Sequence, residues 1–290
     1  MNLKEFRFVR QSAVVALAGA LLAVSAVAQQ STQQPPQGAA QPSGQQAAQE
    51  IRPKMVATPG IPSTGFSGLD QYRASRVPML LDDYGQLARY RAADEELKNG
   101  AAVADRVVFF GDSITDTWKL DNYFAGKPYV NRGISGQTTP QMLVRFRQDV
   151  IELKPKAVVI LAGTNDIAGN TGPMRMEDIE ADLASMAELA KAHGIAVVLA
   201  SVLPVHDYTP KSQDFFAQRP MARILEVNRW LKEYCAKNAM VYLDYSSAMV
   251  DEKGLLKKDL AEDGLHPNDA GFKIMAPLAK AAIAKATGTH

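Results

Sequence analysis

An apolar run that stops at a glycine, an aspartate and a serine constrains this chain most. Residues 106–110 are long enough for one buried strand, and Gly111-Asp112-Ser113 follows directly. In an open parallel sheet, ligands bind just beyond the carboxyl ends of the strands. The hydroxyl of Ser113 is therefore a candidate nucleophile. The alternative is that Ser113 only caps a following helix, a role that serine often fills.

The rest of the chain alternates between apolar runs and helical patterns. The predicted strands span residues 106–110, 128–132, 157–161, 195–202 and 240–245. The predicted helices span residues 80–98, 140–153, 177–193, 221–238 and 268–286, and a long loop covers residues 203–221. This alternation predicts an α/β fold, in which a five-stranded parallel sheet forms the middle of a three-layer α/β/α sandwich.

The first 28 residues have the pattern of a secretory signal peptide. Three basic residues precede an uncharged apolar run over residues 12–27, and Ala26-Val27-Ala28 is a small-x-small cleavage site. We therefore expect an exported protein, periplasmic or secreted, with no stable membrane insertion after cleavage. A retained membrane anchor is the alternative, since the run is close to the shortest that spans a bilayer.

Residues 29–65 are predicted to be a disordered tether, because they are rich in Gln, Pro and Ala and poor in large apolar side chains. Residues 66–290 then form the catalytic domain. Without residues 1–28, the balance of 32 Lys+Arg against 31 Asp+Glu becomes 29 against 30. That near-neutral balance argues against nucleic acid as a partner. Cys235, the only cysteine, lies in a helical pattern, where a buried structural thiol is expected.

Four polar clusters follow or flank the predicted strands, and a parallel sheet can bring them to one edge. They are Gly111-Asp112-Ser113, Asn131–Gly136, Gly163-Thr164-Asn165-Asp166 and Glu262–Pro267.

Hydrolysis of an ester by a serine needs a base, a group that orients the base, and donors for the oxyanion. His266 can be the base, and Asp263, three residues earlier, can hold the imidazole nitrogen that does not face Ser113. Asn165 offers a side-chain amide and Gly136 a backbone N–H. Taken alone, each residue has a structural alternative, such as a cap or a turn; together and in this order they favour catalysis.

In these four blocks the chain resembles the GDSL esterases and lipases, also called SGNH hydrolases. The resemblance implies a flavodoxin-like sheet and a catalytic triad of Ser113, His266 and Asp263. It also implies an oxyanion hole made by the backbone N–H groups of Ser113 and Gly136 and the side chain of Asn165. No cofactor is expected, and four histidines in separate contexts show no metal-ligand spacing.

We therefore expect a serine ester hydrolase that works through an acyl-serine intermediate. Its partner would be a small-molecule or carbohydrate ester, and export inclines the prediction towards acetyl or short acyl groups. One alternative is a lysophospholipase or thioesterase acting on longer acyl chains. Another is a non-catalytic carbohydrate- or envelope-binding module that retains the fold. Asp112 is assigned to the turn, and His206 is interpreted as a solvated loop residue.

Overall fold

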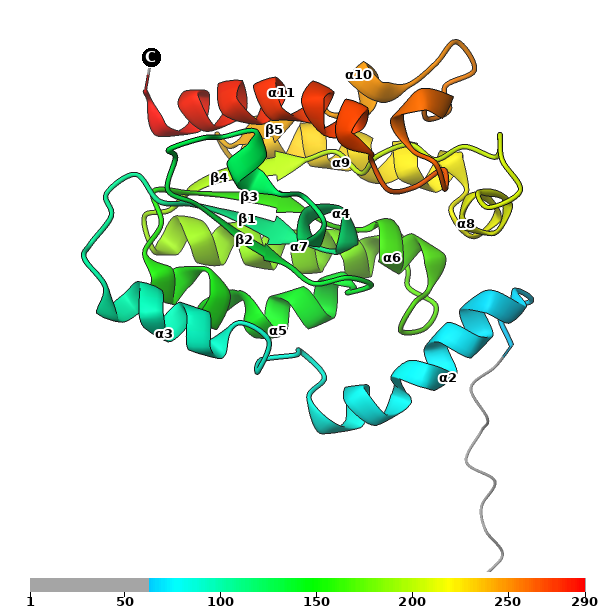
Figure 1. Ribbon diagram of the computed structural model, residues 1–290, viewed down its shortest axis with the longest axis horizontal. Coiled ribbons are helices and arrows are strands. Elements are labelled where there is room, and N and C mark those ends of the chain that lie inside the picture. The colour runs from blue at the N-terminus through cyan, green and yellow to red at the C-terminus, as the bar shows by residue number, and fades with distance from the viewer. Residues whose placement is uncertain (1–62, 290) are drawn as a thin grey trace, which may run out of the picture. The chain divides into compact units, whose positions relative to one another are not determined.

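The computed structural model describes residues 63–289 (Figure 1). The predicted signal peptide and nearly all of the predicted tether lie outside these residues. Within the described part of the chain, no helix combines the length and the apolar character that crossing a membrane requires.

Five short strands form one parallel sheet with the order β2-β1-β3-β4-β5. This is the flavodoxin-like order, so the predicted fold class and all five predicted strands are confirmed. Both ends of each observed strand lie within two residues of the predicted ends. The strands are β1 (Val107–Gly111), β2 (Tyr129–Gly133), β3 (Ala157–Leu161), β4 (Ala196–Ala200) and β5 (Val241–Leu243).

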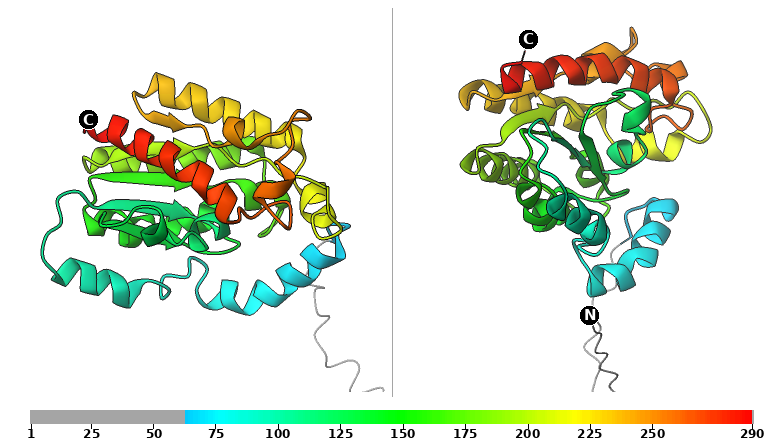
Figure 2. Two further views of the ribbon diagram at one scale, coloured as in Figure 1. Left: turned by 45° about the horizontal axis from the view of Figure 1, so that its top comes forward. Right: turned by 60° about the vertical axis from the view of Figure 1, so that its left-hand side comes forward.

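Helices cover both faces of the sheet (Figures 1 and 2). The long helices α5 (Thr139–Asp149), α7 (Met176–Ala192) and α9 (Met221–Lys237) pack on one face. Helix α11 (Asp269–Thr287) packs on the other, together with the short elements α4 (Ser113–Asp116), η1 (Leu120–Asn122) and α10 (Ser246–Met249). The remaining elements are α2 (Ser67–Asp82), α3 (Arg91–Asn99), η2 (Ile151–Leu153), α6 (Thr164–Ala168), α8 (Gln213–Gln218) and η3 (Lys258–Leu260).

Strand β1 shows why both faces are covered. All five of its residues are buried, and successive side chains point to opposite faces. Phe110 packs against Phe146 of α5, in the core cluster that includes α7 and α9, whereas Phe109 packs against Trp118, in the core cluster that includes α11. Trp118 is therefore a core residue, because it is buried against Phe109. Cys235 lies in α9 at 1% exposure, and burial raises the pKa of its thiol to about 11, so the expectation of a structural thiol is confirmed.

The prediction of one helix over residues 80–98 is wrong. The chain turns between α2 and α3, because the Asp83 carboxylate accepts the backbone N–H groups of Leu87 and Ala88, and Gln86 adopts a left-handed backbone (φ 54°). Helix α2, which begins at Ser67, was not predicted. Its sequence is polar and contains Pro78, so it lacks a clear apolar stripe.

Two further boundaries differ from the predictions. Helix α5 is capped by Thr138 rather than Thr139, through a capping box with Gln141, and it ends at Asp149. The predicted long loop 203–221 contains a short helix, α8.

Phe110 provides a test of the core. Its ring is fully buried, lies 5.2 Å from the ring of Phe146 between centroids, and has the Arg145 guanidinium 4.1 Å from its centroid. We expect Phe110→Ala to lower the free energy of unfolding by about 3–5 kcal/mol, because it removes these contacts and leaves a cavity. Leu81→Ala, at a side chain that is 84% exposed, is the control and should change it by less than about 0.5 kcal/mol. Urea unfolding measures both, and equal effects would contradict this account of the core.

Candidate active site

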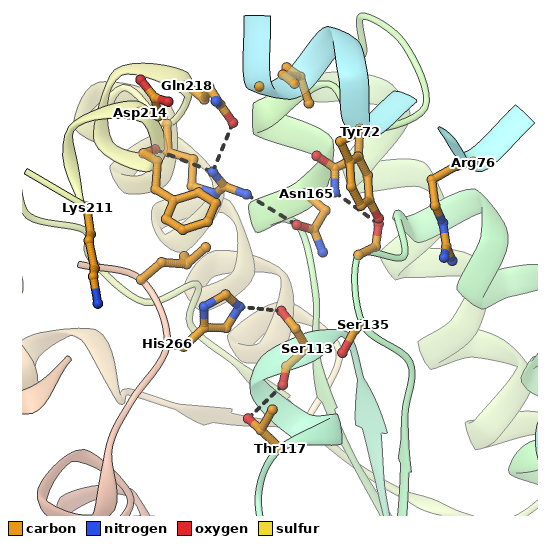
Figure 3. Close-up of a pocket in the computed structure, with 17 residues that line it drawn as sticks. Tyr72, Arg76, Ser113, Thr117, Ser135, Asn165, Lys211, Asp214, Gln218 and His266 are labelled. Atoms are coloured by element: carbon orange, nitrogen blue, oxygen red, sulfur yellow. Dashed lines mark hydrogen bonds between the residues drawn. The ribbon is translucent and has the colours of Figure 1, made fainter. Parts of the chain in front are cut away.

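The predicted polar clusters meet around a cavity of about 700 Å³ (Figure 3). Ser113, Gly136, Asn165 and His266 all line this cavity. The first three follow β1, β2 and β3, and His266 precedes α11. The parallel sheet thus brings together residues that lie up to 153 positions apart in the sequence.

Two hydrogen bonds connect three of the predicted residues in a row. Ser113 Oγ lies 2.8 Å from His266 Nε2, and His266 Nδ1 lies 2.7 Å from Asp263 Oδ2. Because an ionised carboxylate only accepts, Nδ1 carries the hydrogen and Nε2 presents its lone pair to the serine hydroxyl. In this arrangement the imidazole can take the hydroxyl proton.

Asp263 is held in its ionised form. Burial alone would raise the pKa of its carboxyl group, but hydrogen bonds outweigh burial and hold the pKa well below its ordinary value. The donors are the His266 side chain and the backbone N–H groups of His266 (2.8 Å) and Leu265 (3.0 Å). The carboxylate can therefore orient the imidazole and stabilise its positive charge.

Asp112, and not Ser113, caps α4. The Asp112 Oδ1 atom accepts the backbone N–H of Ile114 at 3.0 Å. The alternative that Ser113 serves only as a helix cap is therefore wrong, and its hydroxyl is available to His266. The expected role of Asp112 in holding the turn is confirmed.

The residues that carry the three predicted oxyanion donors line the same cavity. The Asn165 Nδ2 atom donates one hydrogen to the Gln137 carbonyl at 3.0 Å, which leaves its second hydrogen for a ligand. Among the hydrogen bonds within residues 63–289, none uses the backbone N–H of Ser113 or of Gly136. All three donors are thus available to an oxygen atom in the cavity.

Position 136 requires glycine for two reasons. Its φ of +81° is a left-handed conformation that side chains disfavour. A Cβ atom there would also lie 1.8 Å from the hydroxyl oxygen of Tyr72. Glycine therefore allows α2 to approach the loop after β2.

Two walls of the cavity come from segments that sequence reasoning did not connect with the site. Leu69 and Tyr72 belong to α2, and Phe215 belongs to α8. The Phe215 ring meets the His266 ring edge-on, with centroids 5.9 Å apart. The spacing of Leu69 and Tyr72, three residues apart, was the one signal for this face of α2.

The interpretation of His206 as a solvated loop residue is wrong. Its side chain is fully buried, Nε2 lies 2.9 Å from the Ala261 carbonyl, and Nδ1 accepts the backbone N–H of Tyr208. Its own backbone N–H donates to the Gly264 carbonyl at 3.1 Å. His206 therefore supports the loop that carries Asp263 and His266.

Known proteins resemble this chain both in sequence and in fold. Residues 109–274 match the family described as GDSL-like Lipase/Acylhydrolase. The crystal structure of a GDSL-like lipase from Bacteroides thetaiotaomicron VPI-5482 superposes with a TM-score of 0.64 at 39% identity. That match covers 70% of this chain and 99% of the lipase.

Two relatives by sequence are more distant. An acetylxylan esterase from Geobacillus stearothermophilus is 27% identical over 206 residues, which are 59% of this chain and 90% of the esterase. An uncharacterized lipoprotein from Bacillus subtilis (strain 168) is 31% identical over 151 residues, which are 44% of this chain and 62% of the lipoprotein. The chain thus spans less than two thirds of the length of the lipoprotein.

A second buried carboxyl group belongs to Asp166, the residue after Asn165 in α6. Asp166 Oδ1 accepts the backbone N–H and the hydroxyl of Thr139, at 2.8 and 2.7 Å. Its Oδ2 atom is buried and has no partner within the described residues. Burial raises the pKa of Asp166 to about 7, although the bonds from Thr139 oppose the shift. The fold therefore favours the protonated form of this side chain.

This shift predicts a pH dependence of stability. Between the ordinary pKa of 3.8 and about 7, the unfolded chain holds fewer protons at Asp166 than the folded chain. Stability associated with this group is therefore present below pH 3.8 and is lost as the pH rises towards 7. We expect Asp166→Asn to make the fall in unfolding free energy over this pH range shallower. Urea unfolding at several pH values measures the slope, with exposed Asp121→Asn as the control. Parallel curves of unfolding free energy against pH for the wild type, Asp166→Asn and Asp121→Asn would contradict the prediction.

Proposed function

The chain belongs to the GDSL-like lipase/acylhydrolase family, and on that basis we propose that it is an exported serine ester hydrolase. The observation that carries the proposal is the hydrogen-bonded row from Asp263 through His266 to Ser113, which opens on a cavity lined with oxyanion donors. Ser113 is the nucleophile, His266 the general base, and Asp263 the residue that orients the base.

The reaction follows from this geometry. His266 Nε2 takes the proton of the Ser113 hydroxyl as Oγ attacks the carbonyl carbon of the ester. The carbonyl oxygen becomes an oxyanion, to which the N–H groups of Ser113, Gly136 and Asn165 donate. The bond to the alcohol then breaks, and His266 gives its proton to the departing alcohol oxygen. Water repeats these steps on the acyl-serine and releases the carboxylic acid.

For the substrate we propose acetyl or short-acyl esters, with a carbohydrate as the alcohol. A cavity of about 700 Å³ is in the size range of small-molecule sites and exceeds what an acetyl group fills. The aromatic rings of Tyr72 and Phe215 line it and can pack on the C–H faces of a sugar. The 27% identical acetylxylan esterase supports the same substrate class.

The apolar side chains of the cavity favour a second candidate, hydrolysis of longer acyl chains. Leu69, Phe215 and Leu265 can surround a hydrocarbon chain as well as a sugar face. A lysophospholipase or thioesterase is therefore the alternative.

Export rests on the signal-peptide pattern of residues 1–28. The name of the Bacillus subtilis relative, a lipoprotein, supports the same location outside the cytoplasm.

The first test is Ser113→Ala. We expect hydrolysis of p-nitrophenyl acetate to fall by roughly four to six orders of magnitude, because the members of a triad act as a unit. Ser247→Ala, at an exposed serine that bonds to Asp244, is the matched control and should retain full activity. A fluorophosphonate probe, which labels activated serines, should label the wild type and the control but not Ser113→Ala. A non-catalytic module would leave all three proteins unlabelled, and an active Ser113→Ala protein would refute the nucleophile.

The second test is a panel that crosses acyl length with the type of alcohol. We expect kcat/KM to be higher for acetylated sugars than for long-chain lysophospholipids or acyl thioesters, since the aromatic walls suit a sugar ring. Steady-state kinetics on each class decides between the two candidates. A preference for long-chain lysophospholipids or thioesters would replace our substrate with the second candidate while leaving the mechanism intact.

A further inference from the structure

Arg219, between α8 and α9, is a buried cation in the wall of the cavity. It is 2% exposed and lines the cavity beside Asn165. Within residues 63–289, no carboxylate lies within ion-pair distance of its guanidinium. A buried charge without an ionic partner is costly, so its hydrogen bonds must compensate.

The guanidinium bonds instead to neutral acceptors. Nε donates to Thr164 Oγ1 at 3.0 Å, and Nη2 donates to Asn165 Oδ1 at 3.3 Å. The bond to Asn165 is the dashed line that ends on this residue in Figure 3. Nη1 makes longer contacts with the Phe215 carbonyl (3.4 Å) and Gln218 Oε1 (3.5 Å). Two of the four bonds thus reach α6, which carries the side-chain donor of the oxyanion hole.

A guanidinium can only donate hydrogen bonds, and this property fixes the orientation of the amide. The Asn165 oxygen must face Arg219, so the NH₂ group must face the other way. On that side, one hydrogen goes to the Gln137 carbonyl at 3.0 Å and the other is directed to the cavity. A flipped amide would direct two donors at Arg219 and an acceptor at the oxyanion.

The charge on Arg219 persists at neutral pH. Burial lowers the pKa of the guanidinium to about 10, while the charges of Asp112 and Asp263 act in the opposite direction. A cation on the oxygen side of an amide strengthens the N–H donors of the same amide.

We propose that Arg219 is a positioning residue of the oxyanion hole, which acts by holding the Asn165 amide with its NH₂ group towards the substrate oxygen. The inference rests on the proposed function, because it assigns a role within that reaction. Since the oxyanion exists only after the attack of Ser113, Arg219 should affect kcat more than KM.

A double-mutant cycle tests this action through Asn165. We expect Asn165→Ala to lower kcat for p-nitrophenyl acetate by roughly 100- to 1000-fold, the effect of losing one oxyanion donor. Arg219→Met, which keeps an unbranched apolar stem but removes all donors, should lower kcat by about 10-fold or more with KM changed by less than about 3-fold. In the Asn165→Ala background the same change should cost less than about 2-fold, because the amide it positions is gone.

The conservative and control variants complete the experiment. Arg219→Lys keeps a charge and a donor and should recover part of the activity lost in Arg219→Met. Arg223→Met removes a nearby arginine that bonds to the Met174 carbonyl and does not line the cavity, and it should retain full activity. Thermal unfolding shows whether each variant is folded. If Arg219→Met does not fold, Arg219→Lys takes its place in the cycle, and its loss of kcat should likewise vanish in the Asn165→Ala background.

Other outcomes overturn the inference. Equal losses from Arg219→Met in both backgrounds would make Arg219 a structural anchor of α8 and α9. A rise in KM confined to anionic esters would make it a substrate-binding residue instead. Unchanged kcat in all Arg219 variants would show that Arg219 has no role in the reaction. Absence of ester hydrolysis in the wild-type protein would refute the proposed function itself, which is a separate result.

Discussion

The register of β1 against its two neighbours is the constraint on which the site depends. Gly111 at the end of β1 lies level with Gly133 of β2 and with Leu161 of β3. The three strands therefore end at the same level of the sheet, and the segments that follow them can face one another. A shift of register by one residue would turn each strand's core side chains to the opposite face and separate these segments.

A buried arginine fixes this edge of the sheet. Arg145 of α5 donates to the carbonyl oxygens of Gly111 and Arg132, each at 2.9 Å, and so binds the ends of β1 and β2 together. Its charge is balanced by Asp149 one turn later on the same helix, at 2.8 Å. The Gly111 carbonyl also accepts the backbone N–H of Ile134 at 3.0 Å, so two donors satisfy this carbonyl oxygen at the end of β1. The same interaction therefore satisfies the backbone and fixes the spacing of the candidate site.

Three carboxyl groups near the site show how local hydrogen bonding sets their charge. Asp112 and Asp166 are fully buried, and each has one oxygen without a partner among the described residues. Burial accordingly raises their pKa values, to about 6 and about 7. Asp263 is only partly buried and accepts three hydrogen bonds, so its pKa falls. The carboxylate that faces the imidazole is thus the one of the three whose ionised form the fold stabilises.

Sequence patterns predicted the parts of this protein that are encoded locally. Strands β1, β3 and β4 are continuous apolar runs, and Ser113, Asn165 and His266 each belong to a short polar cluster that the sequence shows directly. Sequence patterns did not place Tyr72, His206 and Arg219 at the site, because their roles come from tertiary contacts with residues far along the chain. The family match spans residues 109–274 and leaves out α2, which supplies Leu69 and Tyr72 to the cavity. On the proposed function, the shared region therefore carries the chemistry, whereas α2 shapes the substrate side of the cavity. Two esterases with the same four blocks can then differ in substrate through a segment that the family pattern does not contain.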